Sequence, residues 1–102
     1  MAISSIERQG AWYEIFDERG KRAKSISYNQ VGELMGWSDS FFITLKDHWY
    51  DIYDDQGKRI KSVSANIGDF VSICAGQFIV RKGSWLDTYD MHGKKISTRA
   101  AR

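Results

Sequence analysis

Hydrophobic and polar residues alternate along short segments that cover most of this chain. The alternation is clearest in FFITLK at 41–46, WYDIYD at 49–54, KRIKSVS at 58–64 and DFVSICA at 69–75. These segments are rich in β-branched and aromatic residues, and glycine-containing turns separate several of them. A period of two with this composition predicts short antiparallel strands, so the fold class that we expect is all-β.

The same pattern occurs three times along the chain. Segments 11–27, 48–64 and 84–100 align without a gap. Their tryptophans lie 37 and 36 residues apart, at Trp12, Trp49 and Trp85. Segments 31–47 and 67–83 match each other as well, while no third copy of them follows Ile96. The sequence is therefore an internal repeat with one segment missing.

The alignment predicts three antiparallel β repeats of about 36 residues in a single domain, 1–102. The repeats span about 3–38, 39–75 and 76–102, and the last of them is incomplete. A period of this length is typical of architectures that use one supersecondary unit per repeat. With four strands in each complete repeat, we expect about eleven strands.

An Asp-x-x-Gly-Lys turn joins the second and third strands of each repeat. Its aspartates and glycines are Asp17, Gly20, Asp54, Gly57, Asp90 and Gly93. Glycine takes the left-handed conformation that follows a type I turn, and the aspartate accepts from the amide two residues on. A calcium loop would need oxygen ligands at alternate positions, where Tyr53 stands in the second repeat. We therefore expect these residues to be structural.

Counting back from the turn predicts the register of each hairpin. In the second repeat the expected pairs are Tyr53 with Arg59, Asp51 with Lys61, Trp49 with Val63, Ile52 with Ile60 and Tyr50 with Ser62. The matching pairs elsewhere are Phe16 with Arg22, Glu14 with Lys24, Trp12 with Ile26, Tyr89 with Lys95, Asp87 with Ser97 and Trp85 with Arg99. An aromatic ring thus faces a cation in every repeat, and an acid faces a base in two, so these charges have structural partners.

The other face of these hairpins is expected to form the core. Its members are Tyr13, Ile15, Ala23, Tyr50, Ile52, Ile60 and Leu86, with Leu34, Ile43, Leu45, Phe70, Ile73, Ile79 and Val80. Because large aromatics are mostly buried, packing between neighbouring repeats is the first expectation for the repeat tryptophans, and exposure to a ligand is the alternative that the sequence leaves open. Trp37 has no counterpart in the other repeats, and we assign it to packing or to an interface.

Composition excludes several classes of function. The 15 basic and 13 acidic residues leave a net charge of +2, which gives no global attraction for nucleic acid or anionic membranes. Cys74 and two histidines, His48 and His92, do not have the spacing of a metal site. No nucleophile, base and oxyanion loop converge, and Cys74 is interpreted as a small buried hydrophobe. We expect no enzyme activity, no cofactor and no bound metal.

The same observations bear on localisation. No apolar segment approaches the roughly 20 residues that span a bilayer, so we expect a soluble protein without a membrane partner. The lone cysteine and the lack of a signal-peptide pattern favour the reducing cytoplasm.

The repeated aromatic and acidic residues suggest a noncatalytic binding module. Each tryptophan is followed two residues later by an acid, giving the candidate ligand-binding residues Trp12, Glu14, Trp49, Asp51, Trp85 and Asp87. A ring beside a carboxylate suits a sugar, and three weak sites would raise avidity for a multivalent glycan. A protein partner could instead take the exposed aromatics into its own pockets.

Single-stranded nucleic acid is the alternative ligand. Its candidate residues are the bases of the third strands: Arg22, Lys24, Arg59, Lys61, Lys95 and Arg99. Bases interleaved with aromatics supply the phosphate contacts and base stacking that such a ligand needs. The acids expected opposite these bases would neutralise much of that charge.

Segment 63–96 joins a glycine-led strand to a tryptophan strand that ends in Asp-x-x-Gly-Lys. It resembles bacterial WG-type β repeats and, more loosely, single blades of β-propellers. The resemblance implies a propeller-blade-like fold and a binding or scaffold role without catalytic residues. Three blades cannot close a ring, whereas two chains supply six, so we expect a homo-oligomer, first of all a dimer. A β-trefoil-like monomer is the alternative.

Overall fold

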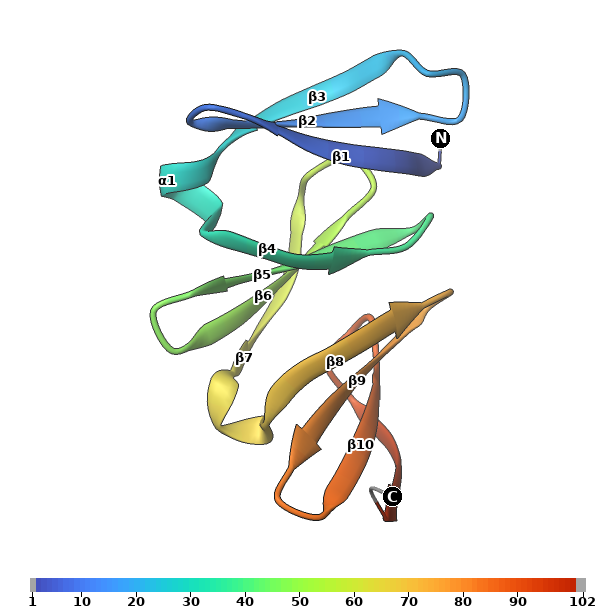
Figure 1. Ribbon diagram of the computed structural model, residues 1–102. Helices are drawn as coiled ribbons and strands as arrows, with labels where there is room; N and C mark the ends of the chain where they lie inside the picture. Colours follow the sequence, from blue (N-terminus) through green and yellow to red (C-terminus); the bar gives the residue numbers. More distant parts are fainter. Residues whose placement is uncertain (1, 101–102) are drawn as a thin grey trace.

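The computed structural model describes residues 2–100 as an all-β protein of eleven strands with two short helical turns (Figure 1). The first sheet contains β1 (Ile3–Gln9), β2 (Trp12–Asp17) and β3 (Arg22–Ser27). The second contains β4 (Glu33–Trp37), β5 (Phe41–Lys46), β6 (Trp49–Asp54) and β7 (Arg59–Ser64). The third contains β8 (Asp69–Cys74), β9 (Gln77–Lys82), β10 (Trp85–Asp90) and β11 (Lys95–Ala100). The predicted fold class and strand number are confirmed.

Each sheet is an antiparallel meander, and the chain enters the next sheet through a helical turn. These turns are α1 (Tyr28–Val31) and the 3-10 turn η1 (Ala65–Ile67). As a result, β4 and β8, which the sequence alignment places at the end of one repeat, pair with the sheet of the following repeat. The sheets formed by residues 2–100 are open, and no closed barrel forms, so the β-trefoil-like alternative is wrong.

The three sheets lie one above another in Figure 1, and a hydrophobic cluster fills each of the two spaces between them. The cluster between the first and second sheets contains Ile3, Ile6, Tyr13, Ile15, Ile26, Val31, Phe42 and Tyr53. The cluster between the second and third contains Phe41, Ile43, Tyr50, Ile52, Phe78, Val80 and Tyr89. Because successive residues of a strand point to opposite faces, the second sheet supplies side chains to both clusters.

The contacts between sheets repeat along the stack. The Tyr13 hydroxyl donates to the Gly32 carbonyl at 3.1 Å, and the Tyr50 hydroxyl donates to the Gly68 carbonyl at 2.7 Å. Phe42 stacks on Tyr53 in the second sheet, with ring centroids 5.0 Å apart. The corresponding rings of the third sheet, Phe78 and Tyr89, lie 5.5 Å apart. The outer faces of the stack depart from this pattern, because Leu86 replaces the tyrosine and Ser5 replaces the phenylalanine.

The Asp-x-x-Gly-Lys turns form as predicted. Gly20, Gly57 and Gly93 have φ values of 78°, 79° and 80°. In the second repeat, Asp54 Oδ1 accepts from the amides of Gln56 and Lys58, both at 2.9 Å. The other two aspartates accept from the equivalent amides. These residues close the hairpins, which confirms the structural assignment.

The predicted register is correct beside each turn and wrong beyond it. Tyr53 faces Arg59, but a β-bulge then inserts Ile60, so Lys61 faces Ile52 and Ser62 faces Asp51. The same bulge leaves Ala23 and Ile96 unpaired in the other hairpins. The correct pairs are Glu14 with Ser25, Ile15 with Lys24, Trp12 with Ser27, Tyr50 with Val63, Trp49 with Ser64, Asp87 with Thr98 and Trp85 with Ala100. An extra residue on one strand shifts every later partner by one.

The predicted core is correct for the strands that lie inside the stack. The buried members are Tyr13, Ile15, Ile43, Tyr50, Ile52 and Val80. Ala23 is exposed, and Leu34, Leu45, Ile60, Phe70, Ile73, Ile79 and Leu86 are half-buried. The prediction missed Phe42, Tyr53, Phe78 and Tyr89, which are buried because the second and third sheets have a neighbour on that face. Cys74 is exposed beside the β8–β9 turn, so its assignment as a buried hydrophobe is wrong.

Burial makes this fold sensitive to high pH. Desolvation raises the pKa of Tyr13, Tyr50, Tyr53 and Tyr89 above the ordinary value of 10.0. A raised folded-state pKa means that the stability is complete below about pH 10 and is lost as the pH rises through the folded pKa. We expect the urea midpoint to fall above about pH 10 as phenolates form. The Tyr50→Phe variant should show a smaller fall. Phenolate absorbance that titrates normally while the protein remains folded would contradict this prediction.

A short turn precedes each of the three strands that begin with tryptophan. Asp47 begins the second of these turns, where the other two have glycine. Its φ is 58°, and the same repeat position holds Gly10 at 63° and Gly83 at 60°. An L-residue is strained in this conformation, so Asp47→Gly should raise the free energy of unfolding by about 0.5 to 1 kcal/mol, as measured by urea denaturation. The converse change, Gly83→Asp, should lower it by a similar amount. An unfolding energy that drops on Asp47→Gly would contradict this explanation.

Candidate ligand-binding sites

Three equivalent groups of side chains, here called the tryptophan clusters, lie on the same face of the three sheets. Each contains an exposed tryptophan, a carboxylate, a base and a hydroxyl, together with the polar residue that faces the tryptophan from the preceding strand. The first cluster is Gln9, Trp12, Glu14, Arg22 and Ser25; the second is Lys46, Trp49, Asp51, Arg59 and Ser62; the third is Lys82, Trp85, Asp87, Lys95 and Thr98. The structure thus brings together all six candidate ligand-binding residues in three copies of one arrangement.

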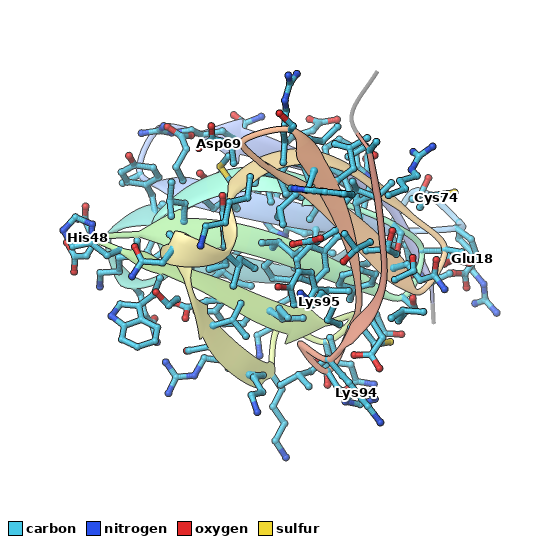
Figure 2. The ribbon with its side chains drawn as sticks, turned by 90° about the horizontal axis from the view of Figure 1, so that it is seen from below. Glu18, His48, Asp69, Cys74, Lys94 and Lys95 are labelled. Atoms are coloured by element: carbon cyan, nitrogen blue, oxygen red, sulfur yellow. The ribbon has the colours of Figure 1, made fainter. Side chains whose placement is uncertain are left out.

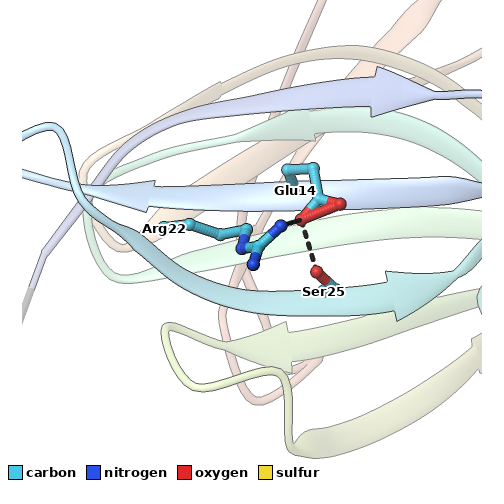
Figure 3. Close-up of polar contacts among 3 residues, drawn as sticks. All are labelled: Glu14, Arg22 and Ser25. Carbon is cyan, nitrogen blue, oxygen red and sulfur yellow. Dashed lines mark hydrogen bonds and ion pairs between the residues drawn. The ribbon is translucent and has the colours of Figure 1, made fainter.

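The carboxylate of each cluster is held by the hydroxyl of the facing strand. Ser25 donates to Glu14 Oε1, and Arg22 Nη1 lies 3.5 Å from the same oxygen (Figure 3). Ser62 donates to Asp51 Oδ1 at 2.5 Å in the second cluster. A hydroxyl donor on each acid orients the carboxylate before any ligand arrives.

The third cluster repeats this geometry with a lysine. Thr98 donates to Asp87 Oδ1 at 2.7 Å, while Lys95 Nζ lies 4.0 Å from Asp87 Oδ2. Asp87 and its equivalent Asp51 are only 7% and 6% exposed. Both of these nearly buried carboxylates thus have a hydroxyl partner on the facing strand.

The tryptophans are exposed, so their expected packing between repeats is wrong. Trp12, Trp49 and Trp85 are 50%, 50% and 54% exposed. Trp49 and Trp85 are the first residues of their strands, so their rings lie at the end of the sheet rather than over the centre, where the neighbouring sheet packs. Trp12 lies on the face of β2 opposite to Tyr13 and Ile15, the outer face of the first sheet, over which no other sheet of residues 2–100 packs. About half of the surface of each tryptophan is therefore available to a ligand.

A shallow hollow lies at each cluster. The hollows of the second and third clusters are lined by their tryptophans, whereas that of the first is lined by Gln9, Glu14, Phe16 and Arg22 without Trp12. Their volumes are about 510, 360 and 240 Å³ in the first, second and third clusters. The first two values lie in the lower half of the range of roughly 300 to 1,000 Å³ that is usual for small-molecule sites, and the third lies below it. Each hollow suits one ring of a larger ligand.

The bases proposed for nucleic acid lie on two different faces. Arg22, Arg59 and Lys95 belong to the tryptophan clusters. The side chains of Lys24 and Lys61 instead lie against the turn glycines of the next sheet, Gly57 and Gly93. Arg99 faces Leu86 on the outer face of the third sheet. The β-bulge that shifts the register is the reason for this division.

Sequence reasoning missed the hydroxyls and the residues before the tryptophan hairpins. Ser25, Ser62 and Thr98 occupy the same repeat position, and this recurrence was the signal that could have identified them. The hydroxyls were overlooked because a hairpin without a bulge would pair each acid with the residue before the hydroxyl. Gln9, Lys46 and Lys82 face the tryptophans directly and recur in the same way.

Other reactive side chains do not converge. Figure 2 shows His48 and Cys74 on opposite sides of the molecule. Among residues 2–100, no three histidine, cysteine, aspartate or glutamate side chains are grouped so as to hold a metal ion. The same part of the chain contains no helix that is long and apolar enough to cross a membrane.

Comparisons with protein-family models, curated proteins and solved structures give no match to this chain. The geometry of the tryptophan clusters is therefore the basis for a functional proposal.

Proposed function

We propose that this protein is a noncatalytic binding module that holds the sugar rings of a glycan at its three tryptophan clusters. The observation that carries the proposal is the threefold recurrence of a half-exposed tryptophan beside a carboxylate that a hydroxyl already orients. The face of an aromatic ring is electron-rich and suits the C–H groups of a sugar. The carboxylate accepts hydrogen bonds from the sugar hydroxyls, and such charge-assisted bonds are strong.

The charge of the third cluster favours a sugar that carries negative charge. This cluster places two bases, Lys82 and Lys95, around one acid, whereas the hollow of the second cluster is lined by two bases, Lys46 and Arg59, and two acids, Asp47 and Asp51. The first cluster has a single base, Arg22, because Gln9 replaces the lysine. A uronic acid or a sulfated sugar at the third cluster would complement this excess of positive charge.

A protein ligand is the second candidate. Exposed tryptophan and arginine are the residues that most often anchor protein interfaces, and the second cluster offers Trp49 and Arg59 together. In this case a continuous surface would matter rather than three separate hollows. The two candidates therefore differ in whether the three clusters act independently.

The stacking of the sheets supports a further part of this proposal, that each repeat is a propeller-like blade of the WG type. Serial blades require equivalent contacts between successive sheets. Here the two inter-sheet clusters have equivalent members, and the tyrosine contacts recur from one sheet to the next. Binding at the same position of successive blades then follows from the repeat itself.

We also propose that two chains associate through the outer faces of their stacks, giving six sheets. The outer face of the third sheet carries Leu86 and Thr88, and that of the first carries Ser5 and Phe16, all half-buried. Both faces are less apolar than the internal ones, so we expect a weak, concentration-dependent homodimer. Light scattering across the micromolar range tests this, and a strictly monomeric species would exclude it.

A glycan array, combined with a single-stranded DNA binding assay at two salt concentrations, tests the proposed function. We expect glycan binding that changes only modestly with salt. The triple variant Glu14→Gln, Asp51→Asn and Asp87→Asn should lose it, because an amide accepts more weakly than a carboxylate. Asp55→Asn, in a turn outside the clusters, is the matched control. Binding to DNA alone with a steep salt dependence would replace the glycan proposal with the nucleic-acid alternative.

A further inference from the structure

The first sheet has an open edge where the other two sheets have a strand. β4 pairs with β5 and β8 pairs with β9, and the repeat places β1 at the position of β5 and β9. Within residues 2–100, no strand pairs with that edge of β1. The one backbone hydrogen bond that these residues make there runs from the Ile3 amide to the Asp39 carbonyl, at 2.8 Å. An unpaired edge is a template for strand addition.

The register identifies which residues of β1 would receive a strand. Ile6 and Arg8 occupy the repeat positions of Ile79 and Arg81 in β9. Those two residues face Ser72 and Asp69 of β8. The tight β1–β2 turn pairs Gln9 with Trp12, and the antiparallel alternation then directs the backbone N–H and C=O of Ile6 and Arg8 outward.

The charge at this edge complements an acid on the incoming strand. Arg8 and Arg81 have matching contacts, since the Nε atom of each donates to a glycine carbonyl two residues on, at 3.0 and 3.2 Å. Arg81 faces Asp69 across the sheet, whereas the exposed Arg8 has its guanidinium 3.9 Å from the centre of the Tyr28 ring. An acid at the position of Asp69, which Figure 2 labels in β8, would face Arg8 in the same way.

A partly exposed apolar surface lies beside the edge. Phe70 and Ile73 of β8 lie against Gly36 of β4, within about 3 Å of the position that a Cβ atom there would take. The equivalents of these two residues in β4 are Leu34 and Trp37, and Trp37 is 38% exposed. A strand beside β1 would therefore cross Leu34 and Trp37, and it would need a small residue at that point.

We propose that the open edge of β1 binds an extended segment of a partner protein that has the pattern glycine, acid, apolar, any residue, small, apolar. This is the pattern that β4 and β8 share with their preceding glycines, as Gly-Glu-Leu-Met-Gly-Trp at 32–37 and Gly-Asp-Phe-Val-Ser-Ile at 68–73. The segment pairs antiparallel with β1, its acid faces Arg8, and its small residue lies over Trp37. Main-chain bonds supply affinity, and these side chains supply specificity.

A labelled peptide with the sequence of residues 66–73, Asn-Ile-Gly-Asp-Phe-Val-Ser-Ile, tests the proposal by fluorescence anisotropy. The chain is used at a concentration at which light scattering shows a monomer. We expect saturable binding, and we expect Arg8→Glu to weaken it by about tenfold. A peptide with lysine in place of the aspartate should restore the affinity for the Arg8→Glu variant. Arg19→Glu, in an exposed turn, is the matched control for net charge. A peptide with leucine in place of the serine should not bind.

Several results would overturn the proposal. These are the absence of binding, binding that Arg8→Glu and Arg19→Glu weaken equally, and failure of the exchanged charges to restore affinity. Arg8 is exposed, and circular dichroism verifies that its variant folds; Arg8→Gln provides a milder second variant. The experiment contains no glycan, so its outcome is independent of the proposed function.

Discussion

Replacing Ile52 with alanine is expected to lower the free energy of unfolding by about 2 to 5 kcal/mol. Ile52 is fully buried on the face of β6 that packs against the third sheet, in the same cluster as Ile43 and Phe78. The substitution removes apolar contacts and leaves a cavity that two packed sheets cannot easily close. Urea denaturation followed by circular dichroism measures the change.

The repeat provides matched positions for this measurement. Ile15 is the equivalent residue of the first sheet and is also fully buried, so Ile15→Ala should behave like Ile52→Ala. Thr88 is the equivalent residue of the third sheet, and no further sheet formed by residues 2–100 packs over it, so Thr88→Ala should change stability by about 0.5 kcal/mol at most. Equal losses at Ile52 and Thr88 would contradict the stacking of the sheets.

Removing the tryptophans one after another is expected to reduce glycan affinity stepwise. A single change, such as Trp85→Ala, leaves two clusters and should weaken binding to an immobilised multivalent glycan only moderately. The change of Trp12, Trp49 and Trp85 together should weaken it by a factor on the order of 10² to 10⁴, because the avidity of linked sites is lost. Surface plasmon resonance with immobilised glycan measures both effects.

Folding and binding can be separated in these variants. The three tryptophans are about half exposed, so their replacement should change the urea midpoint little, provided that the sheet ends remain paired. Trp37→Ala is the matched control, since Trp37 is also exposed but lies in β4, outside the clusters. Equal loss of glycan binding in Trp37→Ala would show that the clusters are not the sites. Unchanged binding in the triple variant would show the same.

Individual residues show how far the sequence predicted the candidate sites. Trp49 and Asp51 were found because a residue pattern recurs every 36 or 37 positions, and the structure places them together. Ser62 was not paired with Asp51, because period-two alternation gives no sign of the bulge at Ile60 that shifts the register by one residue. The exposure of Trp49 was not predicted either, because it depends on how far the first sheet extends over the second.

The sequence by itself determined the local structure of this protein. Alternation specified the strands, and the recurring aspartate and glycine specified the hairpins, since both depend on interactions between residues close in the chain. Only the tertiary structure decided that β4 and β8 pair with the following sheet, that the second sheet is buried on both faces, and that the tryptophans remain exposed. Burial depends on which surfaces meet in space, and one strand can offer either of its two faces to a neighbour.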